Sequence, residues 1–104
     1  MARGIDPLST AVRRLEPLLE TQEATRGLRA ASSRGAIVLS RDWQDDPSAD
    51  PEPAPRFRLV PLARDQFGLS LYRRNRWERL PFQGTLEELV DVMNTALAPW
   101  AAEF

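Results

Sequence analysis

Hydrophobic residues recur regularly over positions 8–31. Their spacings of three and four predict a helix with one apolar face. They are Leu8, Val12, Leu15 and Leu19. Pro7 suits the first position of a helix, whereas Pro17 removes a backbone hydrogen bond, so we expect the helix to be kinked or split there. The small residues of "SSRG" (32–35) predict the end of this helical region.

Four later segments have the length and composition of β-strands. The first, "AIVLS", is short, apolar and β-branched, which predicts a buried strand. All four are "AIVLS" (36–40), "FRLVPL" (57–62), "FGLSLYR" (67–73) and "RWERLPF" (76–82). Arg74 and Asn75 separate the last two, and they predict a two-residue hairpin turn because asparagine tolerates a positive φ.

The turn at Arg74 and Asn75 determines which side chains share a face of the sheet. The pairs predicted on one face are Phe67 with Phe82 and Leu69 with Leu80, and those on the other are Tyr72 with Trp77 and Ser70 with Arg79. Two registers remain open for the preceding strand. A four-residue turn at 63–66 adds Phe57 and Leu59 to the Tyr72 face, and a shift of one residue sends both to the core.

The segment "GTLEELVDVMNTALAPW" (84–100) predicts a second helix. Thr85 as N-cap and Glu88 three residues later form a capping box. The apolar stripe that follows consists of Leu86, Val90, Met93 and Leu97. Pro99 cannot continue a helix, so we expect this one to end near Ala98.

The order of these elements predicts a single α+β domain over residues 1–104. It has an N-terminal helix, a mostly antiparallel sheet of about four strands, and a C-terminal helix packed on one face of the sheet. The segment "RDWQDDPSADPEPAP" (41–55) is rich in proline and acid, which predicts a loop. Trp43 is the one large apolar residue of that loop.

Charge is distributed unevenly along the chain. The net charge is only −1, yet residues 42–52 sum to −5, residues 53–82 to +5, and residues 83–104 to −4. A near-neutral total therefore conceals a basic middle between two acidic stretches.

The composition excludes several kinds of chemistry. The chain has no cysteine and no histidine, and all 14 basic residues are arginine, so disulfides, thiolate metal sites and Schiff-base lysines are impossible. Glu87, Glu88 and Asp91 fit a solvated helix face better than an acid–base pair. A second acidic cluster consists of Asp42, Asp45, Asp46 and Asp50, and its spacing does not match that of a calcium-binding loop. We therefore expect a protein that is not an enzyme, with no catalytic residues, no metal site and no cofactor.

Neither a membrane span nor an export signal is visible. No run of about 18 apolar residues occurs, and the first ten residues, "MARGIDPLST", lack an apolar signal core. We expect a cytoplasmic protein that does not bind membranes.

The hairpin segment "LYRRNRWERLPF" (71–82) is the candidate functional surface. The residues singled out are Arg58, Tyr72, Arg74, Arg76, Trp77 and Arg79. Three interpretations compete. In the first, the N-terminal helix covers the aromatic residues, and the Trp43 loop can neutralise the arginines. In the second, the face binds another protein or a second copy of the chain, and in the third, bases of a single-stranded nucleic acid stack on it. Among the functional interpretations we favour protein binding, because the acidic stretches cancel the long-range field that nucleic-acid binding needs.

The segment "FGLSLYRRNRWERLPFQGTLEELVDVMNTALAPWA" (67–101) resembles the C-terminal part of small conserved cyanobacterial proteins that have no assigned activity. It covers about a third of the chain and implies a bacterial cytoplasmic protein, with no functional residue to carry over. The order of strands followed by one helix also resembles single-strand-binding proteins of the Whirly type, in topology alone.

Overall fold

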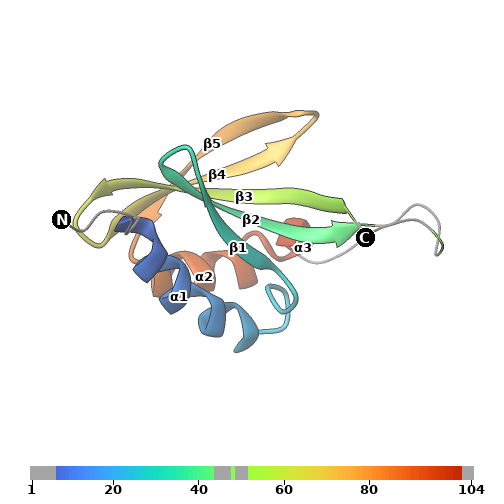
Figure 1. Ribbon diagram of the computed structural model, residues 1–104, viewed down its shortest axis with the longest axis horizontal. Helices are drawn as coiled ribbons and strands as arrows, with labels where there is room; N and C mark the ends of the chain where they lie inside the picture. The colour runs from blue at the N-terminus through green and yellow to red at the C-terminus, as the bar shows by residue number, and fades with distance from the viewer. Residues whose placement is uncertain (1–6, 44–47, 49–51, 102–104) are drawn as a thin grey trace.

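Five antiparallel strands and three helices make up the residues that the computed structural model describes, which are 7–43, 48 and 52–101. In chain order they are α1 (Pro7–Glu20), β1 (Arg29–Ser33), β2 (Ala36–Trp43), β3 (Glu52–Ala63), β4 (Gln66–Arg73), β5 (Arg76–Gly84), α2 (Leu86–Asn94) and α3 (Ala98–Ala101). The strands form one sheet in the order β1-β2-β3-β4-β5. Figure 1 shows the helices together on one side of this sheet. The α+β class is confirmed, with five strands where about four were predicted.

The additional strand, β1, lies where the sequence predicted a longer first helix. Helix α1 ends at Glu20, and Gly27 turns the chain with a φ of 92°, which favours glycine. Arg34 and Gly35 both have positive φ values, 50° and 79°, and form the two-residue turn that pairs β1 with β2. The sequence of β1, "RAASS", was missed because it has none of the large β-branched residues that mark a strand.

Pro17 does not split the first helix. Helix α1 is continuous from Pro7 to Glu20, and Pro17 lies in its last turn. Because a proline nitrogen would bond four residues back, only the carbonyl of Arg13 loses its helical partner. One missing bond near a helix end costs less than a break in the middle.

The predicted loop over 41–55 is shorter than expected at both ends. Strand β2 extends to Trp43 and β3 begins at Glu52, so that Pro53 pairs with Asp42 and Pro55 with Ser40. Strand β4 pairs with β3 only from Phe57 onward. Both prolines therefore lie where β3 has one neighbouring strand, a position that tolerates a missing N–H. The predicted acidic residues Asp45, Asp46 and Asp50 lie outside the described residues, as does the side chain of Trp43.

Strand β3 contributes two fully buried residues to the core. Phe57 and Leu59 are both 0% exposed, so of the two predicted registers the one that sends them to the core is correct. The cause is a bulge: Leu62 is an extra residue between Pro61, which pairs with Phe67, and Ala63. The core joins residues of both long helices to the sheet; its largest fully buried members include Leu15, Leu19, Ile37, Leu39, Leu69, Leu86, Leu89, Val90 and Met93.

The β4–β5 hairpin confirms half of the predicted register. Tyr72 lies opposite Trp77 and Ser70 opposite Arg79, but Phe67 lies opposite Gly84 and not Phe82. The pair predicted between Leu69 and Leu80 is likewise absent from the described ladder. The register shifts because β5 bulges over residues 80–82, where proline lacks the N–H that a regular ladder requires.

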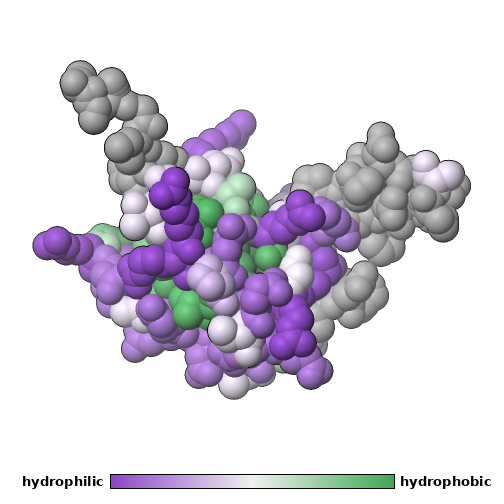
Figure 2. All heavy atoms as spheres, turned by 60° about the horizontal axis from the view of Figure 1, so that its bottom comes forward, coloured by the Kyte–Doolittle hydropathy of each residue, from purple (hydrophilic) through white to green (hydrophobic). Residues whose placement is uncertain are grey.

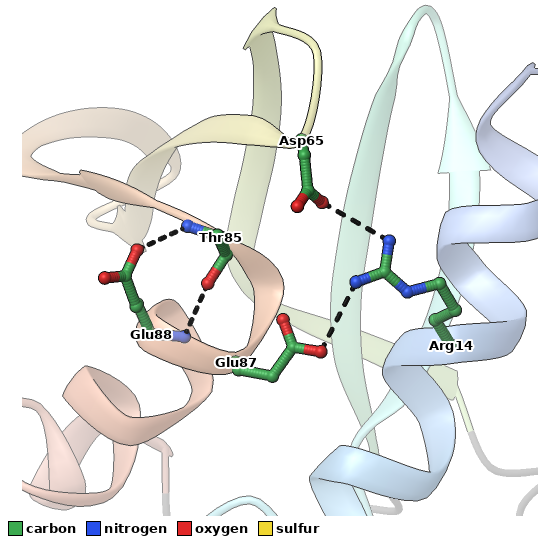
Figure 3. A network of polar contacts seen from close by, with 5 residues as sticks. All are labelled: Arg14, Asp65, Thr85, Glu87 and Glu88. Carbon is green, nitrogen blue, oxygen red and sulfur yellow. Dashed lines mark hydrogen bonds and ion pairs between the residues drawn. The ribbon is translucent and has the colours of Figure 1, made fainter.

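The capping box of α2 forms as predicted (Figure 3). The amide of Thr85 donates to Glu88 Oε1 at 2.8 Å, and the amide of Glu88 donates to Thr85 Oγ1 at 3.2 Å. In the same view, Arg14 of α1 donates to Asp65 in the β3–β4 turn and to Glu87 in α2, both at 3.3 Å. Both hydrogen bonds raise the pKa of the Arg14 guanidinium, and the bond to Asp65 has the larger effect.

Helix α2 ends at Asn94, before the predicted end near Ala98. The Asn94 side chain donates to the carbonyl of Val90 at 2.8 Å and to Thr25 Oγ1 at 3.0 Å. Its oxygen accepts from the amides of Ala24 and Thr25 at 2.8 and 3.2 Å. Thr25 is 0% exposed, and its hydroxyl donates to the carbonyl of Leu19. A buried polar network thus fixes the 21–28 connection against the end of α2.

Replacing Asn94 with alanine should lower the free energy of unfolding by about 2 kcal/mol, because the change removes the acceptor of the partly buried amide bonds from Ala24 and Thr25. Urea denaturation measures the loss. Gln83→Ala, at an exposed position, is the control and should change stability by less than about 0.5 kcal/mol. Equal effects of the two substitutions would contradict the structural role given to the network.

The hairpin turn should tolerate glycine and reject a β-branched residue. Arg74 and Asn75 have φ values of 52° and 65°, so both occupy the left-handed region. We expect Asn75→Val to cost about 1–2 kcal/mol. Asn75→Gly should change stability by less than about 0.5 kcal/mol, because glycine adopts positive φ freely. Thermal or urea unfolding of both variants tests this, and a tolerated valine would show that the turn has another geometry.

Candidate binding surface

The face of the sheet directed away from the helices is the candidate surface, and we call it the open face. By strand register it carries Val38, Arg58, Val60, Ser70, Tyr72, Trp77 and Arg79. Among the described residues, its apolar members Val38, Val60, Tyr72 and Trp77 neither belong to the hydrophobic core nor pack against it. Helix α1 contacts β1, β2 and α2 instead. The interpretation in which the first helix covers the aromatic residues is therefore wrong.

Three side chains from three strands form a cluster on the open face. Tyr72 and Trp77 make an edge-to-face pair with ring centroids 4.9 Å apart and an interplanar angle of 64°. The guanidinium carbon of Arg58 lies over the Trp77 ring, 4.8 Å from its centroid, a cation–π distance. Tyr72, Trp77 and Arg58 are all half-buried, so each keeps solvent-accessible surface. The cluster is thus ordered by its own contacts and remains accessible.

Two hollows flank the cluster. One, of about 260 Å³, lies on the β5 side and includes Leu62, Gly68, Ser70 and Arg79 in its lining. The other, of about 550 Å³, lies towards the β1–β2 turn and includes Arg34, Gly35 and Val38. Arg58, Val60 and Trp77 line both hollows. The cluster therefore stands between two depressions of the same face.

The structure brings four of the six predicted residues together. Arg58, Tyr72, Trp77 and Arg79 lie in adjacent positions of β3, β4 and β5 on the open face. Arg74 lies in the hairpin turn. Arg76 pairs with Arg73, and because side chains alternate along a strand, it lies on the face opposite Trp77. Arg76 is thus not a member of the candidate surface.

Sequence reasoning missed the apolar half of this surface. Val60 lies two residues from Arg58, so strand alternation could have placed it there. Gly68 in mid-strand was a further signal, because glycine in a strand marks close approach of another group. Leu62 reaches the surface only through the bulge, which no local pattern in β3 predicts. Leu62 is 43% exposed, and in the described part of the chain it is one of two large apolar residues classed as exposed.

Two arginines of the open face lack the carboxylate partner that three arginines elsewhere in the described structure have. Arg14, Arg29 and Arg73 each form an ion pair with a carboxylate. Arg58 and Arg79 form none with any described residue. In addition, the Nε of Arg58 is buried and has no hydrogen-bond acceptor within the described residues. The open face therefore carries positive charge that the described structure does not neutralise.

The opposite side of the molecule differs in character. Figure 2 looks at the helices, where hydrophilic side chains dominate and apolar atoms show only in restricted patches between them. Glu16, Glu87 and Asp91 are among the exposed residues of α1 and α2. This side thus offers acidic groups mixed with the exposed Arg13 and Arg14 of α1, whereas the open face offers cationic and aromatic groups.

Comparisons with known proteins define no class for this chain. No protein-family model matches it, and neither curated proteins nor solved structures contain a match. The resemblance to cyanobacterial proteins thus stays a prediction. In the described part of the chain, no helix is both long enough and apolar enough to cross a membrane. The geometry of the open face alone must carry a functional argument.

The partial exposure of Trp77 predicts that its removal leaves the protein folded. Trp77→Ala should cost about 1.5 kcal/mol or less, because it removes one aromatic pair and one cation–π contact outside the core. Phe57→Ala, two strands away in β3 and fully buried, should cost about 3–5 kcal/mol. Urea denaturation of both variants makes the comparison. A loss for Trp77→Ala as large as that for Phe57→Ala would show that Trp77 is a core residue.

Proposed function

We propose that the chain is a non-enzymatic binding module, such as an adaptor or assembly factor, whose open face binds a protein that presents acidic groups. The observation that carries the proposal is the accessible cluster of Arg58, Trp77 and Tyr72, which lies beside Arg79, a residue with no ion pair to any described residue. Tryptophan, tyrosine and arginine are the residues enriched in the hot spots of protein interfaces. The cluster is already assembled, so binding costs little ordering of these side chains.

A single-stranded nucleic acid is the alternative ligand, and the pair of Tyr72 and Trp77 is the observation in its favour. Bases stack on aromatic faces that are free. Arg58 already lies over one face of Trp77, and the edge-to-face pair leaves Tyr72 and Trp77 without a common flat platform. Two convergent arginines also supply few phosphate contacts, from which most nucleic-acid affinity arises. Both arguments favour a protein.

A second copy of the chain is a weaker candidate for the same face. In a two-fold symmetric dimer, each patch meets its own copy. The open face would then place Arg58 and Arg79 near the same cations of the second copy, and like charges at an interface are unfavourable. An acidic partner avoids this repulsion.

The proposal also depends on the surroundings of the open face. We infer that α2 packs on the opposite face of the sheet, since its buried residues Leu86, Leu89, Val90 and Met93 belong to the same core as the strands. That packing leaves the open face as the broad surface on which a partner can dock. We further propose that the protein acts in the bacterial cytoplasm, with no metal, cofactor or catalytic group.

Site-specific photocrosslinking tests the proposal. A benzophenone amino acid replaces Gln83, an exposed residue that pairs with Gly68 at the rim of the open face, or Asp91, an exposed residue of α2. We expect position 83, and not position 91, to crosslink a discrete protein in extract of the source cells. The crosslinked protein is then identified and purified, and its dissociation constant is measured.

The double variant Trp77→Ala with Arg79→Ala should weaken binding of that purified partner at least about tenfold, since it removes two hot-spot side chains. Arg76→Ala, on the other face of the same hairpin, should leave binding nearly unchanged. Crosslinks that nuclease digests, and that do not form when irradiation takes place at moderate salt, would support nucleic-acid binding instead. Equal crosslinking from both positions, or binding that survives the double variant, would contradict the proposal.

A further inference from the structure

A cross-strand row of three residues lies at the centre of the smaller hollow. Arg58 pairs with Ser70, and Ser70 pairs with Arg79, so one row crosses β3, β4 and β5. Directly opposite residues of paired strands point to the same face, and neighbouring strands are about 4.8 Å apart. The α-carbons of Arg58 and Arg79 are thus separated by about 10 Å, with a serine between them.

The floor of this hollow is formed by small residues. Ser70 is only 4% exposed, and Gly68 has no side chain. A Cβ added at Gly68 would lie 3.5 Å from Leu62 Cδ1, so the leucine side chain lies over the glycine. Leu62, Val60 and Trp77 form an apolar wall beside the row. The hollow therefore has a cationic part and an apolar part next to each other.

The two arginines of the row keep donors for a ligand. Arg41, by contrast, donates to the carbonyls of Arg26, Ala24 and Ala101, and Arg14 donates to two carboxylates. Arg58 and Arg79 have no such acceptor among the described residues, while stacking on Trp77 holds the Arg58 guanidinium in place. A guanidinium that is fixed but unpaired suits a carboxylate, which it can bind through two parallel hydrogen bonds.

We propose that the hollow binds a short acidic–apolar segment of the partner protein. The carboxylate of an aspartate or glutamate lies between Arg58 and Arg79, and the neighbouring apolar side chain packs against Leu62, Val60 and Trp77. This assignment rests on the proposed function and names the partner's chemistry. The size agrees, because about 260 Å³ is below the 300–1,000 Å³ typical of small-molecule sites and suits a short segment of a protein.

Selection from a random heptapeptide library against the full chain tests the assignment. We expect the selected peptides to carry aspartate or glutamate next to leucine, isoleucine or phenylalanine. The tightest peptide is then synthesised in matched versions: the acid replaced by its amide, the apolar residue replaced by serine, and the acid replaced by phosphoserine. Removal of the carboxylate charge should weaken binding about tenfold or more, the usual effect of losing a charged hydrogen bond.

Protein variants supply the matched controls. Arg58→Gln and Arg79→Gln should each weaken the acidic peptide about tenfold and should not weaken its amide version further. Arg76→Gln removes the same charge from the same strand but on the opposite face, and should change binding by less than about twofold. Far-ultraviolet circular dichroism confirms that each variant is folded. Gly68→Leu, which fills the floor of the hollow, should abolish binding of every version.

Several outcomes would overturn the assignment. They are selection of no peptide, peptides without enriched acids, equal binding of acid and amide, and tighter binding of the phosphoserine version, which would reassign the anion to phosphate. Failure here and failure of the proposed function are distinguishable. A partner crosslinked at Gln83 through a segment without acids would remove this assignment and leave the function standing. Selection of acidic peptides without any crosslinked protein would support this assignment and contradict the proposed function.

Discussion

The open face depends on the antiparallel register of β4 and β5, which the two-residue turn at Arg74 and Asn75 determines. With both residues at positive φ, the turn closes on Arg73 and Arg76, and the next pair is Tyr72 with Trp77. A slip of β5 by one residue would send Trp77 to the side of the helices, bring Arg76 and Glu78 to the open face, and leave Tyr72 there without its aromatic partner. The cation–π contact with Arg58 also requires this register, because Trp77 must lie two strands away from β3 on the same face.

The helices share one hydrophobic core with the strands. Leucines of α1 and α2 fill the core, and polar side chains fix the connections that surround it: Asn94 binds the 21–28 segment, and Arg41 binds the carbonyls of that segment and of α3. The terminal guanidinium nitrogens of Arg41 thus have carbonyl partners within the molecule. Arg58 and Arg79 have no carboxylate partner among the described residues, and we therefore assign these two arginines to binding.

The sequence predicted the features that depend on local chemistry, and it missed those that depend on distant contacts. The capping box of Thr85 and Glu88 and the pair of Tyr72 with Trp77 each follow from residues a few positions apart. Two features do not follow from local residues. The bulge at Leu62 depends on the pairing of β3 with β4, and the end of α2 at Asn94 depends on a segment some 70 positions away. As a result the aromatic and cationic half of the candidate surface could be predicted, and so could Val60 by strand alternation, whereas Leu62, which reaches the surface through the bulge, could not.

Fluorescence quenching of Trp77 tests the central claim most directly. In a chain whose other tryptophans, Trp43 and Trp100, are replaced by phenylalanine, quenching by iodide is compared with quenching by caesium. Because Trp77 is accessible and lies beside Arg58 and Arg79, iodide should quench it more strongly than caesium, and added salt should reduce the difference. A tryptophan protected from both ions, or quenched more strongly by caesium, would contradict an open cationic face.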